Sequence, residues 1–289
     1  MPIEPPVTSP RDLPAAYAVL ASGSADAPVK PVAGGTDLMV SLTGELAPPP
    51  ASVVDLWAIE ALRGIAIDGD ALTLGALTTY TDVRRSALCR EHVPALVEAA
   101  ATIGAAQIQN RGTLGGNIAN ASPAGDTLPV LLAADAVIVV GSERGERDVP
   151  AAEFWTGYRE TALAHDELIV RIRLPLAAER EMRFRKVGTR RAQAISKVVI
   201  AVAWNERRGD PAWRDVRVAL GSVADRPIRS AAAEEALEGR QPTPESADSA
   251  AEALAAEIHP IDDVRSTADY RRVVAARALH RIVRDAGGW

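Results

Sequence analysis

Two short glycine-containing segments carry the residue types best suited to chemistry in this chain. One lies at residues 34–37 and contains the pair Gly34-Gly35, and the other lies at residues 113–117 and contains the pair Gly115-Gly116. Paired glycines permit a turn with positive φ and leave no Cβ in the way of a ligand, so successive N–H groups can converge on an anion. Thr36, Thr113 and Asn117 add side-chain donors suited to phosphate oxygens.

Two such turns suit the diphosphate of a dinucleotide that is held from both sides. Asp126, farther along the chain, could accept a hydrogen bond from a ribose or ribityl hydroxyl. Neither turn has the pattern G-x-G-x-x-G or G-x-x-x-x-G-K-[ST], which disfavours a Rossmann NAD site and a P-loop. The alternative is that both glycine pairs only form tight turns required by the fold.

The composition excludes several other classes of protein. With 32 basic and 38 acidic residues among 289, the net charge of −6 argues against binding to nucleic acid or anionic membranes. The single cysteine, Cys89, excludes an intrachain disulfide, a protein-held iron–sulfur cluster and a thiolate zinc site. The chain has no run of about 18 apolar residues, and its start lacks the pattern of a signal peptide. We therefore expect a soluble, cytoplasmic protein.

Hydrophobic periodicity and turn residues predict alternating helices and strands in the first part of the chain. Ser9 is the predicted N-cap of the first helix, with Pro10 at its first position. Residues 110–126, rich in Gly, Asn and Ser, are predicted as a long functional loop. The remaining predicted elements are strands at 29–33, 52–55, 64–67, 71–76, 136–140 and 167–174, and helices at 36–42 and 86–103.

Residues 175–181 have the composition of a domain boundary. Beyond it we predict strands at 183–187, 197–206 and 214–223, followed by helices at 230–237, 244–258 and 267–285. Arg271 and the other arginines of the last helix are expected on its polar face, and Trp155 and Tyr158 in the core.

Residues 102–126 closely resemble a signature of the FAD-binding (medium) subunits of molybdenum hydroxylases. This family includes xanthine dehydrogenase, carbon monoxide dehydrogenase, 4-hydroxybenzoyl-CoA reductase and aldehyde oxidoreductases. Residues 33–38 match the family's first FAD loop, and the resemblance continues at residues 166–169, 184–187 and 265–271. It thus covers nearly the whole chain in the right order.

The resemblance implies an α+β fold. It predicts an FAD-binding domain of the p-cresol methylhydroxylase (vanillyl-alcohol oxidase) type at residues 1–177, with subdomains at about 1–57 and 58–177. A smaller α+β C-terminal domain is expected at residues 178–289. FAD would lie extended between the two subdomains.

The resemblance also implies which residues contact FAD. Lys186 would approach the flavin, Ile195 would face the isoalloxazine, Ile103 and Ile169 would pack on the cofactor, and Asp126 would bind a hydroxyl. The residues expected around the diphosphate are Val32, Ala33, Gly34, Gly35, Thr36, Asp37 and Leu38 on one side, and Thr113, Leu114, Gly115, Gly116 and Asn117 on the other.

The sequence departs from the family at particular places. Gln109 stands where the family usually has Arg, and the first loop lacks the His that is common in carbon monoxide dehydrogenases. The latter difference weakens an assignment to that substrate. The Cys-rich insertion that holds an extra four-iron cluster in some medium subunits is missing from the sequence.

The function implied by the resemblance is that of an electron-transferring flavoprotein subunit of an oxidoreductase, with no catalytic side chain of its own. A [2Fe–2S] small subunit would supply electrons taken from a substrate by a molybdopterin large subunit, in a dimer of heterotrimers. The flavin would pass them to NAD⁺, oxygen or another terminal acceptor. Two alternatives remain open: a stand-alone flavin-dependent reductase or oxidase of the same fold, and a structural protein with an empty cleft.

Overall fold

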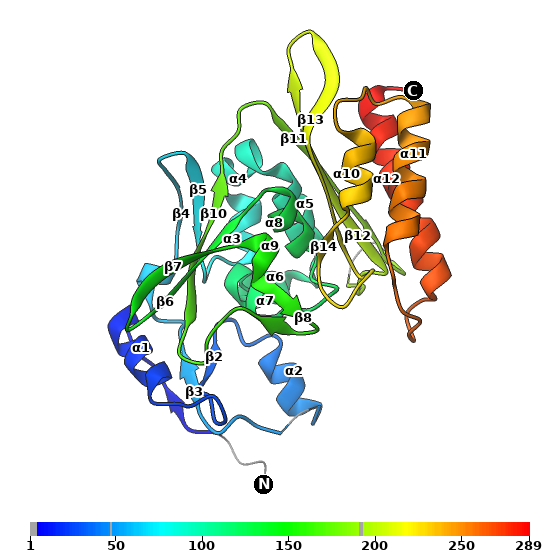
Figure 1. Ribbon diagram of the computed structural model, residues 1–289. Helices are drawn as coiled ribbons and strands as arrows, with labels where there is room; N and C mark the ends of the chain where they lie inside the picture. Colours follow the sequence, from blue (N-terminus) through cyan, green and yellow to red (C-terminus); the bar gives the residue numbers. More distant parts are fainter. Residues whose placement is uncertain (1–4, 47, 191–192) are drawn as a thin grey trace.

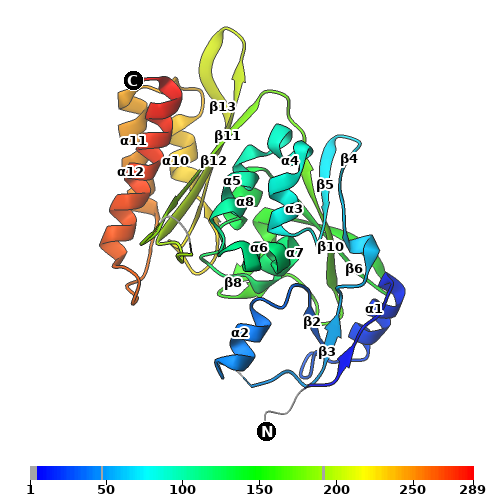
Figure 2. The same ribbon diagram turned by 180° about the vertical axis from the view of Figure 1, so that it is seen from behind.

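A computed structural model describes residues 5–46, 48–190 and 193–289, and Figure 1 shows its layers. A five-stranded sheet and a four-stranded sheet lie on either side of a group of short helices, and a helical layer covers the outer face of the four-stranded sheet (Figures 1 and 2). The predictions for the start of the chain at residues 1–4 and for residue 47 of the proline-rich segment lie outside the described residues.

The N-terminal part forms a small parallel sheet in the order β1-β3-β2. Its first helix begins later than predicted, because Asp12 rather than Ser9 is the N-cap and accepts a hydrogen bond from the Ala15 amide (2.9 Å). Its elements are β1 (Val7–Thr8), α1 (Leu13–Ala21), β2 (Lys30–Val32), α2 (Leu38–Thr43) and β3 (Val53–Asp55).

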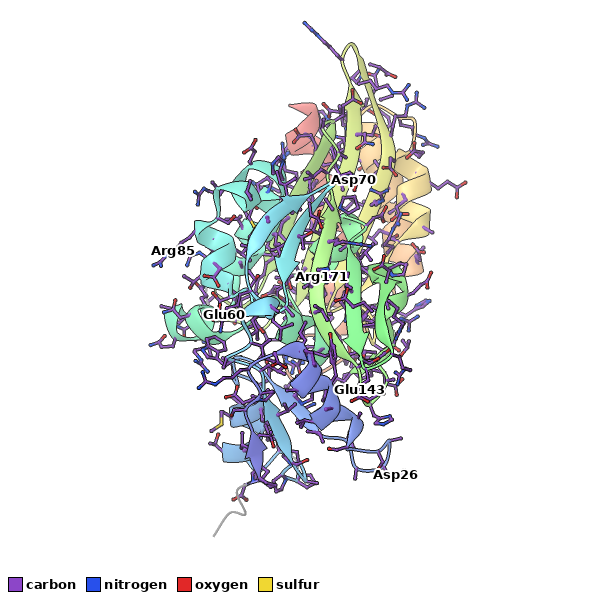
Figure 3. All side chains as sticks on the ribbon, turned by 90° about the vertical axis from the view of Figure 1, so that its left-hand side faces the viewer. Asp26, Glu60, Asp70, Arg85, Glu143 and Arg171 are labelled. Carbon is purple, nitrogen blue, oxygen red and sulfur yellow. The ribbon has the colours of Figure 1, made fainter. Side chains whose placement is uncertain are left out.

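The five-stranded sheet is antiparallel in the order β4-β5-β10-β6-β7. Its inner face packs on the short helices, whereas Arg171 lies on the outer face and pairs with Glu146 of the neighbouring hairpin (Figure 3). The strands are β4 (Ile65–Asp68), β5 (Ala71–Gly75), β6 (Val137–Ser142), β7 (Gly145–Pro150) and β10 (Leu168–Pro175).

The helices and remaining short elements of this part are η1 (Glu60–Leu62), α3 (Tyr80–Arg85), α4 (Ala87–His92), α5 (Pro94–Thr102), α6 (Ala106–Arg111), α7 (Leu114–Asn120), α8 (Leu128–Ala133), α9 (Ala151–Phe154), β8 (Trp155–Gly157) and β9 (Glu160–Thr161).

Two predictions for this part are wrong. The helix predicted over residues 86–103 is two helices, α4 and α5, because Pro94 has no N–H to continue the first and instead starts the second. The long loop predicted over residues 110–126 contains the end of α6 and all of α7. Thr113 caps α7 through its hydroxyl, which accepts a hydrogen bond from the Gly116 amide (3.0 Å), so the two glycines lie inside a short helix.

The C-terminal part is a four-stranded antiparallel sheet in the order β11-β12-β13-β14, with three helices on its outer face (Figure 1). All six elements that the sequence predicts here are present. The elements are β11 (Arg180–Val187), β12 (Val198–Arg207), β13 (Asp210–Gly221), β14 (Ile228–Arg229), α10 (Ala231–Leu237), α11 (Pro244–Glu257) and α12 (Ala268–Gly287).

Strand β12 is buried on both faces, and its side chains pack into two different hydrophobic cores. Ala201 and Ala203 belong to the core under the short helices, where α8 crosses the strand. The alternate positions, which include Trp204, face α10–α12, and the Trp204 indole stacks on Trp213 with the ring centroids 4.1 Å apart. Because alanine side chains are small, α8 can approach the sheet closely, and this contact joins the two parts of the chain.

The acidic pair just before β10 is structural. Asp166 pairs with Arg144, and the Glu167 carboxylate accepts hydrogen bonds from Arg147 Nε (2.8 Å), Arg147 Nη2 (2.6 Å) and the Ala164 amide (2.9 Å). The Arg147 guanidinium holds the pKa of Glu167 below its ordinary range. These bonds tie the loop to the β6–β7 hairpin.

Glu167→Gln keeps the side-chain shape but removes this charge. We expect the free energy of unfolding to fall by about 1–2 kcal/mol at pH 7, because the Arg147 guanidinium loses a charged acceptor. Since the folded-state pKa of Glu167 is lowered, the stabilisation is present above the unfolded-state pKa and is lost as the pH falls through the folded-state pKa.

Urea unfolding of wild type and variant between pH 7 and pH 3 measures this effect. The exposed Glu153 of α9 supplies the control, because Glu153→Gln should leave stability nearly unchanged. A difference between wild type and Glu167→Gln that stays constant as the pH falls would contradict the assignment.

Candidate functional site

A cavity of about 1000 Å³ lies where the N-terminal part, the short helices and the C-terminal part meet. Its wall includes residues from the loop that leads into α2, from α6 and α7, from the β8–β9 turn and from the loops of the four-stranded sheet. The predicted site residues that line it are Thr36, Asp37, Ile103, Asn117, Asp126, Lys186 and Ile195.

The two glycine turns, far apart in the sequence, lie against each other. A Cβ on Gly34 would lie only 1.8 Å from the Arg111 carbonyl oxygen, so only glycine fits at this position. The next residue, Gly35, has φ +75°, a conformation that L side chains rarely adopt. The first turn therefore needs both of its glycines, for different reasons.

The backbone amides of the first turn have no acceptors within the described chain. Gly34, Gly35, Thr36 and Asp37 donate no backbone hydrogen bond to any described residue. Asp37 occupies the N-cap position of α2, yet its side chain accepts no hydrogen bond from that helix. Successive N–H groups that remain uncommitted at the edge of a cavity can donate together to an anion.

The second turn differs, because its amides already have acceptors inside the protein. Leu114 donates to the Thr78 carbonyl (2.9 Å), and Gly115 donates to the Ala76 carbonyl (2.9 Å). A Cβ on Gly115 would lie 2.8 Å from Ala76, so this glycine allows close packing of α7 on the segment after β5. The prediction that both turns present free amides is wrong for the second turn.

Several predicted contact residues do not line the cavity. Ile169 is 3% exposed in the core and pairs with Val140 of β6. Thr113 and Leu114 are also buried. The other predicted residues that do not line the cavity are Val32, Ala33, Gly34, Gly35, Leu38, Gly115 and Gly116.

Asp126 and Lys186, predicted as separate cofactor contacts, form an ion pair across the two parts of the chain. Lys186 Nζ donates to Asp126 Oδ2 (2.6 Å) and to the Thr102 carbonyl (3.2 Å), and each charged side chain is only 8% exposed. The Ser196 hydroxyl donates to the other carboxylate oxygen. Burial raises the pKa of Asp126, and the Lys186 ammonium opposes that shift.

Arg271 is a cavity residue that the sequence predictions placed wrongly. It is 4% exposed rather than on the polar face of α12, and it donates to the Ser222 carbonyl (2.8 Å) and to Asp263 (2.7 Å). Arg271 lies at helical spacing from Ala275 and Leu279, which places it on the buried face of α12. The sequence alone could have predicted this burial.

A second group of missed residues surrounds Asp37. Asn120 Nδ2 donates to Asp37 Oδ1 (3.0 Å), and Arg159 Nη1 donates to Asn120 Oδ1 (2.9 Å). Burial raises the pKa of Asp37, whereas the Arg159 guanidinium opposes the increase. Tyr158, next to Arg159, is 64% exposed on the cavity wall and not in the core as predicted, whereas Trp155 is in the core.

The models of two protein families match nearly the whole chain. The model of the FAD binding domain in molybdopterin dehydrogenase matches residues 2–177, and that of the CO dehydrogenase flavoprotein C-terminal domain matches residues 183–286. The chain belongs to the FAD-binding medium subunits of the molybdenum hydroxylases. It is thus an FAD-binding subunit of an oxidoreductase.

Individual members of the family are similar over nearly their full length. The carbon monoxide dehydrogenase medium chain of Hydrogenophaga pseudoflava is 31% identical over 96% of this chain and 95% of its own. The xanthine dehydrogenase FAD-binding subunit of Escherichia coli O157:H7 is 29% identical over 90% of each chain. A solved Hydrogenophaga pseudoflava carbon monoxide dehydrogenase that lacks the Mo-pyranopterin moiety superposes with a TM-score of 0.91 at 32% identity, covering 97% of this chain and 96% of its own.

These similarities confirm the predicted family, its FAD cofactor and a mixed helix-and-strand fold in which an FAD-binding domain precedes a C-terminal domain. Within the described residues, no helix of this flavoprotein subunit is long and apolar enough to cross a membrane.

Lys186→Met tests the buried ion pair. We expect it to lower the free energy of unfolding by about 3–5 kcal/mol, because it leaves the Asp126 carboxylate buried without its cation. Asp126→Asn should also destabilise, and the double variant should lose less than the sum of the two. The matched control is Arg183→Met on the same strand, where the side chain is exposed and the expected cost is about 0–1 kcal/mol. Additive effects of Lys186→Met and Asp126→Asn in denaturant unfolding would show that the two groups are not coupled.

Proposed function

We propose that FAD occupies the cavity between the two parts of the chain, with its diphosphate at residues 34–37. The uncommitted amides of this turn support the placement, since they have no acceptor among the described residues. Gly35 leaves their approach free of a Cβ, and Thr36 and Asp37 form part of the cavity wall.

The flavin end is proposed to face the C-terminal domain, near Lys186 and Ile195. Ile195 offers an exposed apolar side chain at the cavity wall, which suits contact with an aromatic ring. Lys186 contributes a hydrogen-bond donor rather than a net charge, because the Asp126 carboxylate already balances its ammonium. Ser196 fixes the orientation of that carboxylate.

The subunit is proposed to transfer electrons within a larger molybdenum hydroxylase. FAD, when bound, supplies a redox centre that accepts electrons singly and releases them in pairs. The chain itself holds and shields that centre. Its single cysteine cannot ligate an iron–sulfur cluster, so we assign delivery of the electrons to a separate [2Fe–2S] subunit and their removal from the substrate to a molybdopterin subunit.

The proposed assembly is a cytoplasmic dimer of heterotrimers, and the proposed terminal acceptor is NAD⁺, oxygen or another oxidant. Several relatives are named as parts of larger enzymes, including the nicotine 6-hydroxylase medium subunit of Paenarthrobacter nicotinovorans. Domain limits at residues 177 and 178 are also proposed, with Asp126 and Lys186 meeting across them.

Purification of the tagged chain from its native host tests the proposed assembly. We expect two further polypeptides, FAD, molybdenum and a [2Fe–2S] spectrum to co-purify, and bleaching of the flavin when the substrate of the complex is added. Turnover of a small substrate by the isolated, FAD-loaded chain would instead favour the stand-alone reductase or oxidase.

Gly35→Ala tests the proposed position of the diphosphate. Alanine tolerates the positive φ of this residue poorly, so the neighbouring amides should turn away and the dissociation constant for FAD should rise at least about tenfold. Gly209→Ala is the matched control, since Gly209 has φ +84° and open space around it but lies in a distant hairpin. Flavin fluorescence titration measures both. Equal losses of affinity in the two variants would contradict the placement.

A further inference from the structure

The β8–β9 hairpin carries two residues to the cavity wall, and its base is rigidly held. Trp155 Nε1 donates to the Ile118 carbonyl of α7 (3.1 Å), and the Ala162 amide donates to the Phe154 carbonyl (2.8 Å). The pairing of Gly157 with Glu160 leaves a two-residue turn made of Tyr158 and Arg159, and both of these line the cavity. The hairpin thus places the side chains of its tip at a fixed point on the wall.

Arg159 adopts a backbone conformation that favours glycine. Its φ is +56° at the second position of the two-residue turn, where Gly or Asn would be unstrained. A strained backbone persists where the surrounding structure holds it, and such positions gather at functional sites. An arginine at this position therefore indicates a use for its side chain that the turn itself does not require.

The Arg159 guanidinium lies beside the first glycine turn. Asn120 bridges it to Asp37, which follows Gly35 by two residues. Within the described chain Arg159 donates one hydrogen bond to a protein acceptor, the neutral Asn120 carboxamide, although a guanidinium has several N–H donors. Most of its N–H donors thus remain available beside the uncommitted amides.

Three of the other cations on the cavity wall have acidic partners, whereas a fourth, Arg190, donates to the Gln193 carbonyl. Lys186 is paired with Asp126, and Arg265 and Arg271 both contact Asp263. Their positive charges are therefore largely balanced before any ligand arrives. Arg159 differs from these three, because the group that it donates to carries no charge.

We propose that Arg159 is a further cofactor-binding residue, whose guanidinium binds the FAD diphosphate together with the amides of residues 34–37. This inference rests on the proposed placement of FAD in the cavity. The planar guanidinium fork matches two phosphate oxygens, and its charge complements theirs. Asn120 orients the guanidinium and at the same time keeps the Asp37 carboxylate hydrogen-bonded, away from the phosphates.

Arg159→Gly separates this role from a structural one. Glycine relieves the positive φ, so the FAD-free full chain should unfold at an unchanged or higher temperature. Removal of the guanidinium should nevertheless raise the dissociation constant for FAD about tenfold at low salt, and the ratio to wild type should shrink at high salt. ADP, which carries the diphosphate without the flavin, should show the same loss. Arg159→Lys, which keeps the charge but not the fork, should fall between wild type and Arg159→Gly.

Arg208→Gly, at the turn between β12 and β13, is the control and should bind FAD and ADP as wild type does. The inference is overturned if Arg159→Gly binds both ligands with wild-type affinity at low salt. It is also overturned if this variant lowers the unfolding temperature of the FAD-free chain, since a structural role would then explain weaker binding. Gly35→Ala distinguishes the two proposals. If Gly35→Ala weakens FAD binding and Arg159→Gly does not, only the proposed role of Arg159 is wrong. If both variants bind FAD with wild-type affinity, the proposed placement of the diphosphate at residues 34–37 is wrong as well.

Discussion

The cavity depends on one backbone-to-backbone contact, that of Gly34 with the Arg111 carbonyl. No side chain fits between them, so the loop after β2 can lie directly on the end of α6. This contact brings the uncommitted amides of the first turn beside α7, whose last turn carries Asn117 and Asn120 to the same wall. A larger residue at position 34 would separate the two segments and take the amides away from the side chains that complete the site.

A second constraint on the cavity is the packing of the N-terminal part of the chain against the C-terminal part. The alanine face of β12 lets α8 pack closely on the four-stranded sheet, and this packing removes water from the space next to it. Asp126 and Lys186 therefore meet in a region of low dielectric, where each charge requires the other. The Ser196 hydroxyl and the Thr102 carbonyl satisfy remaining hydrogen-bonding groups of the pair. This part of the cavity wall therefore forms only when the two parts of the chain pack together.

The sequence predicts features that depend on local chemistry and misses those that depend on docking. The requirement for glycine at Gly35 follows from backbone sterics. The break at Pro94 also has a local cause, the missing N–H of proline, although we predicted a continuous helix there. Residue types indicated that Asp126 and Lys186 matter, but their pairing joins positions 60 residues apart and cannot be read from spacing. The sequence did not identify Arg159 as a site residue, because an arginine in a turn normally indicates only an exposed loop.

The distribution of charge explains how a chain of net charge −6 can bind an anionic cofactor. Net charge governs long-range attraction, whereas affinity at a site depends on the few groups that touch the ligand. Around this cavity, the Asp126 and Asp263 carboxylates are paired with cations and the Asp37 carboxylate accepts a hydrogen bond from Asn120, so each acid has a donor of its own. Unused donors remain on the amides of the first turn and on the Arg159 guanidinium. Both face the end of the cavity where the diphosphate is proposed to lie, so selectivity for an anion can coexist with an acidic surface.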